Sequence, residues 1–279
     1  MALNLDGRVV RDRFKGELIE RVKKLGGQPV LAVIQVGSLA ASSLFVSQKV
    51  KFGEAIGGKV NLINLSAQVT FAELQNQILK LNQDSSVRGI IVQLPLPPHL
   101  DVFDVIETID PKKDVDGLTA INLKKLWTNL PAGRQVRGDA IIPATACGVL
   151  SILDFYKIPI EGKRAVVVGR SNLVGGPIAL TLLGRGATIT ICHRKTLNLA
   201  EVTKGAEILV SAAGHPGLIT KNHVSPGQTV IDVGLTPGLD GALFGDVAHA
   251  EVAKIVGAIT PVPGGVGPMT VCSLFLNLL

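Results

Sequence analysis

The stretch 163–194 constrains this chain most, because it reads as a strand, a glycine-rich turn, a helix and a second strand. The first strand, 164–168, is a short β-branched run of the kind found in buried parallel strands. The turn 169–177 leads into helix-forming residues at 178–183, and 187–192 is the second strand. Such a βαβ unit presents free backbone N–H groups and a helix N-terminus to a phosphate.

The turn has the spacing G-x-S-x-x-x-G, with Gly169, Ser171 and Gly175 at its fixed positions. It is one residue longer than the usual dinucleotide fingerprint G-x-G-x-x-G, and Ser171 stands where the second glycine would be. The spacing indicates a dinucleotide site that also includes Arg170 and Val174. The alternative is a plain strand-to-helix turn, since turns of this kind occur without a ligand.

The residues after the second strand favour NADP over NAD. A site for NAD usually has Asp or Glu about 20 residues past the glycines, where the carboxylate binds the ribose 2′-hydroxyl. Here the sequence reads His193-Arg194-Lys195-Thr196 and contains no carboxylate. Two cations and a hydroxyl suit a 2′-phosphate, and Arg170 adds a third cation. The alternative is a solvated basic strand end.

Composition argues against several other classes of protein. The chain has 279 residues, of which 47% are hydrophobic, so it is long enough for two cores. Its net charge of +6 favours anionic partners, but the basic residues are scattered, and only one Trp and one Tyr could stack on bases. We therefore expect anionic small molecules as ligands and no nucleic acid.

The cysteines and the N-terminus bear on metal sites, disulfides and cellular location. Cys147, Cys192 and Cys272 form no C-x-x-C pair, so neither a disulfide framework nor a zinc site is expected. The first residues do not read as a signal peptide, and no apolar run reaches membrane-spanning length without a charge. These features predict a cytoplasmic protein that does not bind membranes.

Strands alternate with helices along the chain, which predicts an α/β fold with parallel sheets and helical crossovers. In the first hundred residues we expect strands at 29–36, 59–65 and 89–94, and helices at 8–25, 40–56 and 71–81. A polar, turn-rich excursion follows at 129–138. Beyond it we expect a helix near 148–155, the βαβ unit, strands at 207–211, 229–233 and 258–259, and a closing helix at 269–279.

A lysine on the expected helix 40–56 is a candidate for proton transfer. Spacings of four, three and four residues place Lys49 in an apolar stripe with Phe45, Phe52 and Ile56. Desolvation in such a stripe would lower the pKa of the ammonium and let it act as an acid or base near neutral pH. The alternative, which periodicity alone slightly favours, is that Lys49 extends to the helix edge with its amine in water.

Two further polar positions are candidates for binding. Gln93 leaves the carboxyl end of an expected strand, so it either binds a ligand or caps nearby backbone. Asp114 and Asp116 stand beside a turn at Gly117. One carboxylate is expected to bind a heterocyclic amine, or else to cap the following segment 119–126. No further ligands follow at useful spacing, so no metal site is expected.

Four segments together resemble the bifunctional methylenetetrahydrofolate dehydrogenase/methenyltetrahydrofolate cyclohydrolase family. They are VQLPLP at 92–97, PKKDVDG at 111–117, VGRSNLVG at 168–175 and GAITPVPGGVGPMT at 257–270. The resemblance covers essentially the whole chain and implies two α/β domains with a cleft between them. These would be a folate-binding catalytic domain at 1–138, a Rossmann-like NADP-binding domain at 139–264, and a C-terminal helix at 265–279 that returns to the first domain.

The resemblance also implies roles for single residues. Lys49, Gln93 and Asp116 are the expected catalytic residues, with Gln93 beside the lysine and Asp116 holding the pterin ring. The substrate is expected to contact Gln93 and Asp116 together with Phe45, Pro263 and Gly264. The expected NADP-binding residues are Gly169, Arg170, Ser171, Val174, Gly175, His193, Arg194, Thr196, Ala213, Gly214, Asp232 and Gly234.

The family resemblance implies two reactions. Hydride passes from 5,10-methylene-tetrahydrofolate to the nicotinamide of NADP, and water then converts the methenyl product to 10-formyl-tetrahydrofolate, in one-carbon metabolism. The cation left by hydride loss is already electrophilic, so no metal is required to activate it. The expected partners are the folate, with or without a polyglutamate tail, and a second copy of the chain in a homodimer.

Two departures from the family pattern bear on these roles. Phe45 stands where the family has a tyrosine whose hydroxyl reaches the lysine, so the alternative function is a dehydrogenase with weak or no cyclohydrolase activity. Arg194 stands where a serine is expected, so a contact with the 2′-phosphate would rest on charge. The sequence is also compatible with a shikimate dehydrogenase-like NADP enzyme and with a folate-binding protein that has no activity.

Overall fold

The computed structural model describes residues 2–37, 40–128, 141–238 and 242–279, so the expected excursion at 129–138 lies outside the described residues. The chain divides into two compact units. The six-strand unit comprises Met1–Asp12 and Leu126–Thr270, and the three-strand unit comprises Arg13–Lys125 and Val271–Leu279. These divisions fall within helices. The domain boundaries at 138 and 264 stay a prediction.

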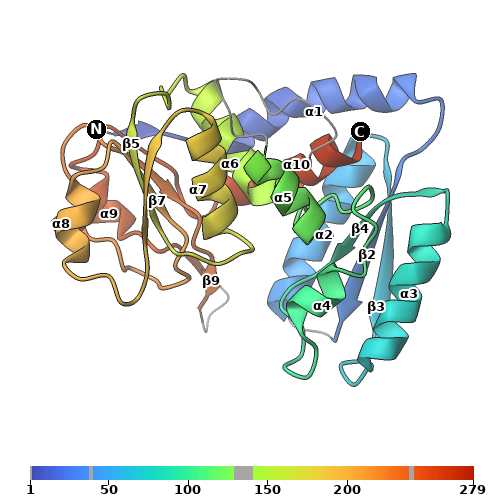
Figure 1. Ribbon diagram of the computed structural model, residues 1–279. Helices are drawn as coiled ribbons and strands as arrows, with labels where there is room; N and C mark the ends of the chain where they lie inside the picture. Colours follow the sequence, from blue (N-terminus) through green and yellow to red (C-terminus); the bar gives the residue numbers. More distant parts are fainter. Residues whose placement is uncertain (1, 38–39, 129–140, 239–241) are drawn as a thin grey trace. The chain divides into compact units, whose positions relative to one another are not determined.

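The three-strand unit is built on a parallel sheet in the order β3-β2-β4, with β2 at Val30–Val36, β3 at Lys59–Leu65 and β4 at Val87–Val92. Figure 1 shows α2 (Ala40–Ala55) and α3 (Phe71–Gln83) on opposite sides of these strands. The short helix α4 (Val102–Ile106) follows β4. Two longer helices cross a unit division, α1 (Gly7–Lys24) and α5 (Ala120–Thr128).

Local sequence accounts for these elements. The central strand β2 is apolar apart from Gln35, in keeping with the burial of its last six residues, whereas the edge strand β3 has only exposed and partly buried positions. Helix α3 begins at Phe71 because Thr70 and Glu73 form a capping box, in which each side chain accepts the other residue's backbone N–H. The predicted strand 59–65 is confirmed at both ends, and the predicted helix 71–81 continues to Gln83.

The six-strand unit is built on a second parallel sheet, in the order β1-β11-β8-β7-β5-β6. Figure 1 shows its strands between α6 and α7 on one side and α8 and α9 on the other. Its strands are β1 (Leu3–Asn4), β5 (Arg164–Val168), β6 (Thr188–Cys192), β7 (Ile208–Ser211), β8 (Thr229–Asp232) and β11 (Ala258–Ile259). Its helices are α6 (Ala144–Phe155), α7 (Gly175–Gly184), α8 (Leu199–Lys204), the 3-10 turn η1 (Lys221–His223) and α9 (His249–Val252), while α10 (Val266–Leu278) crosses the unit division.

The predicted βαβ unit is confirmed. The helix expected near 148–155 begins earlier, at Ala144, and two further helices also begin before the expected residue. Helix α7 begins at Gly175 and not at 178, and α10 begins at Val266 and not at 269. Glycine and proline in those first turns made the sequence look like a loop. Proline is nevertheless compatible with a first turn, because the N–H that it lacks has no partner within the helix there. The strand β1 and the antiparallel pair β9 (Thr236–Pro237) and β10 (Leu243–Phe244) were missed, because two-residue strands carry no periodicity. The equally short β11 was predicted at its observed bounds.

The C-terminal part of α10 packs within the three-strand unit. Its end is held by Arg88, whose Nε donates to Leu278 O at 2.7 Å, and Asn277 Nδ2 donates to Val115 O at 2.8 Å. Phe275 is fully buried and contacts α2 at Gly53, where an added Cβ would lie 2.9 Å from its Cζ and 2.7 Å from Val60 Cγ2. Only glycine therefore lets α2 approach so closely.

We predict that Gly53→Ala lowers the free energy of unfolding by about 1–3 kcal/mol in a denaturant titration, because overpacking outweighs the gain in helix propensity. Gly16→Ala in α1 is the matched control, since a Cβ there meets nothing within 4 Å. That change should stabilise the protein by about 0.4–1 kcal/mol. Equal stabilisation by both substitutions would contradict the packing argument.

Candidate active site

A buried lysine amine is the centre of the first candidate site. Lys49 is only 8% exposed, and its Nζ donates a hydrogen bond to Gln93 Oε1 at 2.7 Å. The apolar stripe predicted for this helix is present, with Phe52 and Ile56 both buried. The alternative in which the amine of Lys49 lies in water is therefore wrong. The helical pattern could not decide this, because burial depends on β4 and the residues after it.

Gln93 is fixed at its backbone and at its side chain. Its backbone N–H donates to Ile34 O on β2 at 2.8 Å, which continues the sheet one residue beyond β4. Its side-chain Nε2 donates to Leu94 O at 2.7 Å, so Oε1 faces the amine of Lys49. The capping interpretation of Gln93 is thus confirmed, since Nε2 binds backbone while Oε1 holds the lysine. Its role in binding a ligand stays a prediction.

Asp114 and Asp116 have separate tasks. The Asp114 carboxylate is buried and accepts from Gly117 N at 2.9 Å and Thr119 N at 2.8 Å, so it fulfils the predicted capping interpretation. Asp116 is partly buried and makes no hydrogen bond with another described residue. Its carboxylate is therefore the one that remains available to a ligand.

The environment shifts both titrating groups toward neutral pH. Burial raises the pKa of Asp116 to about 6, and the nearby Lys49 opposes this shift while Asp114 adds to it. Burial lowers the pKa of Lys49, and attraction to Asp116 opposes that shift. A carboxylate and an amine that titrate closer to neutrality, beside a fixed amide, form a site suited to acid–base chemistry.

The turn between β5 and α7 is the second candidate site. A Cβ on Gly169 would lie 2.1 Å from Ala212 O, and a Cβ on Gly175 would lie 2.1 Å from Gly169 O, so both positions require glycine. Ser171 Oγ accepts from Val174 N at 3.1 Å and shapes the turn before the helix. This is a tight backbone cradle at a helix N-terminus, of the kind that fits the phosphates of a dinucleotide.

Basic residues lie at the ends of two adjacent strands beside this cradle. Strands β5 and β6 pair up to Val168 and Cys192, and Gly169 N donates to Cys192 O at 2.9 Å. After β6, Thr196 Oγ1 accepts from His193 N at 2.8 Å and closes a turn. Arg170 and Arg194 are exposed at these strand ends, and neither forms an ion pair with a described residue. The residues therefore fit a 2′-phosphate.

The ends of β7 and β8 are held by two buried carboxylates. Asp246 accepts hydrogen bonds from four donors, which are Ser211 Oγ (3.0 Å), Ala213 N (2.7 Å), Gly214 N (3.2 Å) and His215 N (2.8 Å). Asp232 accepts from Gly234 N (3.0 Å), Asp246 N (2.9 Å) and Val247 N (2.9 Å). Burial raises the pKa of Asp232 to about 6.

Sequence reasoning missed Asp246. It predicted Ala213, Gly214, Asp232 and Gly234 as cofactor-binding residues, and the structure places all four in this carboxylate network. A lone aspartate between Gly245 and Val247 has no motif that marks its task, because its donors are distant in sequence. The other two predicted substrate residues, Pro263 and Gly264, also lie in the six-strand unit, where Gly264 O accepts from Gly7 N at 2.9 Å.

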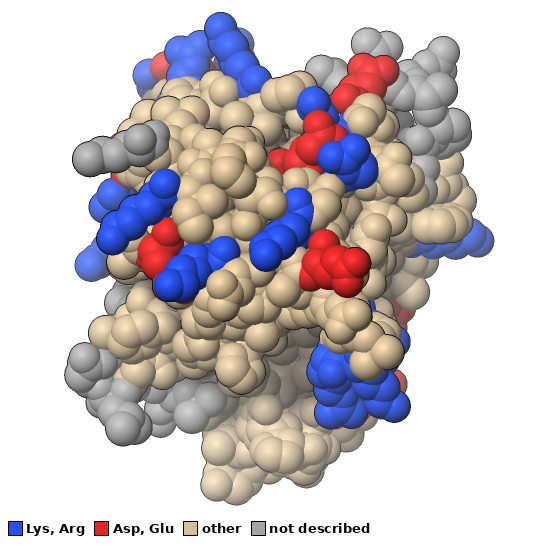
Figure 2. Space-filling view, turned by 90° about the vertical axis from the view of Figure 1, so that its left-hand side faces the viewer, with Lys and Arg blue, Asp and Glu red and all other residues tan. Residues whose placement is uncertain are grey.

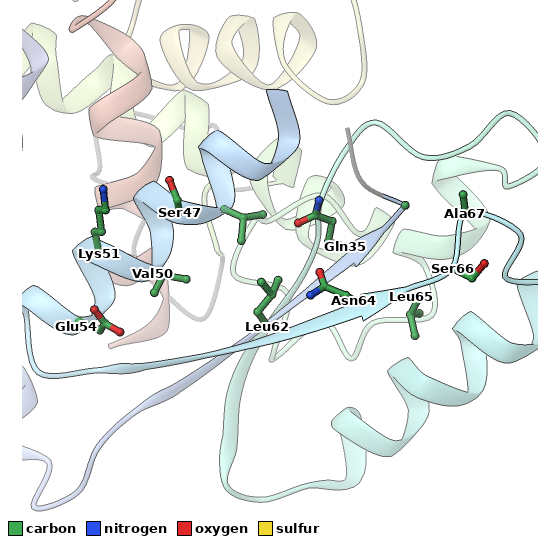
Figure 3. A pocket seen from close by; sticks show the side chains of 12 residues that line it. Gln35, Ser47, Val50, Lys51, Glu54, Leu62, Asn64, Leu65, Ser66 and Ala67 are labelled. Atoms are coloured by element: carbon green, nitrogen blue, oxygen red, sulfur yellow. The ribbon is translucent and has the colours of Figure 1, made fainter. Parts of the chain in front are cut away.

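A separate groove of about 840 Å³ lies beside α2 and β3 (Figure 3). Its lining includes Ser47, Lys51 and Glu54, which are polar side chains of α2. Neither Lys49 nor Gln93 lines it. The groove is therefore distinct from the buried amine.

Three observations concern other classes of site. Within residues 2–37, 40–128, 141–238 and 242–279, no group of three His, Cys, Asp or Glu side chains could hold a metal ion. In the same ranges, every helix is too short or too polar to cross a membrane. On the face shown in Figure 2, Lys and Arg side chains lie at several separate places, some of them beside Asp or Glu.

Fold and sites together define an α/β protein of two units, one with a dinucleotide-type cradle and one with a buried lysine. A model for "Tetrahydrofolate dehydrogenase/cyclohydrolase, catalytic domain" matches residues 5–116, and a model for the NAD(P)-binding domain of the same family matches residues 143–279. The chain is 48% identical over 273 residues to "Bifunctional protein FolD" of Methanospirillum hungatei, which covers 98% of this chain and 95% of that protein. The chain therefore belongs to the tetrahydrofolate dehydrogenase/cyclohydrolase family.

Solved structures agree with this assignment. The bifunctional FolD enzyme of Campylobacter jejuni is similar with a TM-score of 0.93 and 41% identity, and the match covers 100% of this chain and 97% of that one. The Trypanosoma brucei FolD structure, which is complexed with NADP and an inhibitor, matches with a TM-score of 0.93 and 38% identity over 99% of this chain and 96% of that one. The expected fold class is confirmed. Family membership also decides against the shikimate dehydrogenase-like alternative.

We predict that Asp246→Asn speeds hydrogen exchange of the Ala213, Gly214 and His215 amides by roughly 10–100-fold, the effect of weakening a charge-assisted hydrogen bond. Glu251→Gln is the matched control, because Glu251 also accepts one backbone N–H, that of Lys221 at 3.0 Å, on an exposed site. The control should leave the three amides unchanged. Unchanged exchange in Asp246→Asn would show that the loop is held by other contacts.

Proposed function

We propose that this protein oxidises 5,10-methylene-tetrahydrofolate with NADP and then hydrolyses the methenyl product to 10-formyl-tetrahydrofolate. The observation that carries the proposal is the hydrogen bond from the buried Lys49 amine to Gln93, with Asp116 close enough to act on the lysine's charge. Relatives named as bifunctional support it. Both reactions need a bound folate, and the second needs a group that moves protons.

The three-strand unit supplies the folate-binding residues in this proposal. The free carboxylate of Asp116 would accept hydrogen bonds from the amine and ring N–H groups of the pterin. Phe45 lies on the Lys49 face of α2 and is partly buried, so its ring can contact an aromatic part of the substrate. Ionised Asp116 is the binding form, because a protonated carboxyl loses acceptor capacity.

Lys49 would handle the protons of the hydrolysis. Water adds to the methenyl carbon and loses one proton, which the uncharged Nζ of Lys49 can take because burial lowers its pKa. The resulting hydroxyl loses its proton as the bond from carbon to N5 breaks and N5 gains a proton. The product is the N10-formyl group, and one proton is released overall. Gln93 keeps the amine oriented throughout.

The six-strand unit would hold NADP, which when bound supplies the acceptor for the substrate's hydride. Gly169, Ser171 and Gly175 would cradle its phosphates, and Arg170 and Arg194 would supply positive charge for its 2′-phosphate. Asp232 and Asp246 act on the backbone of the neighbouring loops. The neighbour from Trypanosoma brucei, complexed with NADP, supports this choice of cofactor.

One assay tests the whole proposal. Absorbance of NADPH and of methenyl-tetrahydrofolate is followed together after 5,10-methylene-tetrahydrofolate and NADP are added. The bifunctional enzyme should form NADPH while methenyl-tetrahydrofolate is hydrolysed. Accumulation of methenyl-tetrahydrofolate would favour the dehydrogenase with weak cyclohydrolase activity that Phe45 suggested, and the relatives named bifunctional do not favour that alternative. No folate-dependent NADPH would refute the function.

The family resemblance supports three further proposals about context. We propose that the protein is cytoplasmic, that it forms a homodimer, and that its product serves purine biosynthesis. The substrate is proposed to be the folate with or without a polyglutamate tail.

We predict that kcat/KM with NADP exceeds that with NAD by at least about tenfold, or about 1.4 kcal/mol. Arg194→Ser should shrink this ratio, and Arg170→Ala should weaken NADP binding, because each change removes a cation expected at the 2′-phosphate. Lys221→Ser, an equal change of charge at the exposed turn η1, is the control and should leave the ratio unchanged. Equal efficiency with NAD in the unmodified protein would overturn this assignment.

We predict that Lys49→Met lowers the rate of methenyl-tetrahydrofolate hydrolysis by roughly 10²–10⁴-fold, the usual contribution of a general acid–base group. The variant should remain folded and bind NADP, as checked by calorimetry. Lys51→Met, on the exposed face of the same helix, is the matched control and should retain activity. A drop of only about twofold in Lys49→Met would remove Lys49 from the proton-transfer role.

A further inference from the structure

The carboxylate of Asp114 is buried and has no part in the chemistry proposed above. It is 1% exposed, and three donors converge on it. Its Oδ1 accepts from Gly117 N at 2.9 Å, and its Oδ2 accepts from Thr119 N at 2.8 Å and from Asn122 Nδ2 at 2.9 Å. All three donors follow Asp116 in the chain, so Asp114 closes a loop in which Asp116 stands.

The same loop is tied at its beginning. Asn122 Nδ2 also donates to Pro111 O at 2.9 Å, so one amide joins both ends of the segment 111–122. The chain reverses at Gly117, whose φ of +72° is the left-handed conformation that glycine adopts without strain. These bonds leave the backbone on either side of Asp116 little freedom to move.

Two neighbouring elements hold the loop from outside. Ile90 N on β4 donates to Lys113 O at 2.7 Å, and Asn277 Nδ2 on α10 donates to Val115 O at 2.8 Å. Asp116 itself makes no hydrogen bond to another described residue. The position of its carboxylate is therefore set by the hydrogen bonds that hold the loop, which are those to Asp114 and those from β4 and α10.

Asp114 does not contact the substrate directly, because its carboxylate already accepts hydrogen bonds from the protein. Both of its oxygens are occupied by protein donors, and its side chain is closed off from solvent. Its charge nevertheless acts on Asp116, because two carboxylates so near each other disfavour ionisation of the less well-bonded one. Among the described residues, the charged groups that act on Asp116 are Asp114 from its own loop, which raises its pKa, and Lys49 from α2, which lowers it.

We propose that Asp114 is a positioning residue for the folate, which holds the Asp116 carboxylate in its binding place and keeps a second negative charge beside it. The inference rests on the function proposed above. Asp114 would then have two separable effects. Its hydrogen bonds fix the loop that carries Asp116, and its charge governs the pH at which Asp116 ionises.

The test is the pH profile of kcat/KM for 5,10-methylene-tetrahydrofolate at saturating NADP. In the unmodified enzyme Asp116 protonates as pH falls through about 6, so kcat/KM should fall on that acid side. Asp114→Asn removes the neighbouring charge, and the acid limb should move to lower pH by roughly one unit. The loosened loop should also raise KM for the folate about tenfold at neutral pH, as expected for a lost charge-assisted bond. NADP affinity should be unchanged.

Two variants separate these effects from general damage. Asn122→Ala removes a donor but keeps the charge of Asp114, so KM for the folate should rise about threefold or more, while the acid limb stays in place. Asp101→Asn is the matched control, because Asp101 also accepts two backbone N–H groups, of Phe103 and Asp104, at the start of α4. Asp101→Asn should change neither KM for the folate nor the pH at which kcat/KM falls on the acid side.

The outcomes are distinct. The proposal would be overturned if kcat/KM of Asp114→Asn fell at the same low pH as in the unmodified enzyme. It would also be overturned if Asp114→Asn lost kcat/KM equally at every pH and bound NADP more weakly. If Asp114→Asn does not fold, Asn122→Ala decides, and an unchanged KM there would overturn it equally. Failure of the underlying function is recognised separately, because the unmodified enzyme would then show no folate-dependent formation of NADPH.

Discussion

The hydrogen bond between Lys49 Nζ and Gln93 Oε1, 2.7 Å long, is the interaction on which the proposed chemistry depends. An ammonium removed from water loses solvation, and burial therefore lowers the pKa of Lys49. One amide oxygen and the nearby charge of Asp116 offset that cost in part. The amine is thus kept in place and loses its proton more readily than a lysine in water, which makes the uncharged, proton-accepting form more accessible.

Buried carboxylates that bind backbone N–H groups recur in both units. Asp114 accepts from three donors in the three-strand unit, and Asp246 accepts from four in the six-strand unit, where Asp232 accepts from three more. Each stands beside residues proposed to bind a ligand. A carboxylate fully occupied by donors fixes a loop without covering its ligand-facing surface, so rigidity and access to the ligand are supplied by different residues.

Much of the fold was predictable because its signals are local. The strands 59–65 and 164–168 were predicted to the residue from β-branched and apolar runs, and the stripe around Lys49 followed from helical spacing. The starts of α7 and α10 were placed three residues late, because glycine and proline in a first turn resemble a loop. Asp246 could not be found, since its four donors lie more than thirty residues away in the chain.

The sequence by itself determined the alternation of strands and helices, the glycine cradle after β5, and the lack of a carboxylate after Cys192. These properties belong to neighbouring residues, whose spacing and side-chain type are read directly. Only the tertiary structure decided that Lys49 is buried, and that of two adjacent carboxylates Asp114 binds backbone while Asp116 stays free. Desolvation and hydrogen bonding depend on which distant segments pack around a group, and no local pattern carries that information.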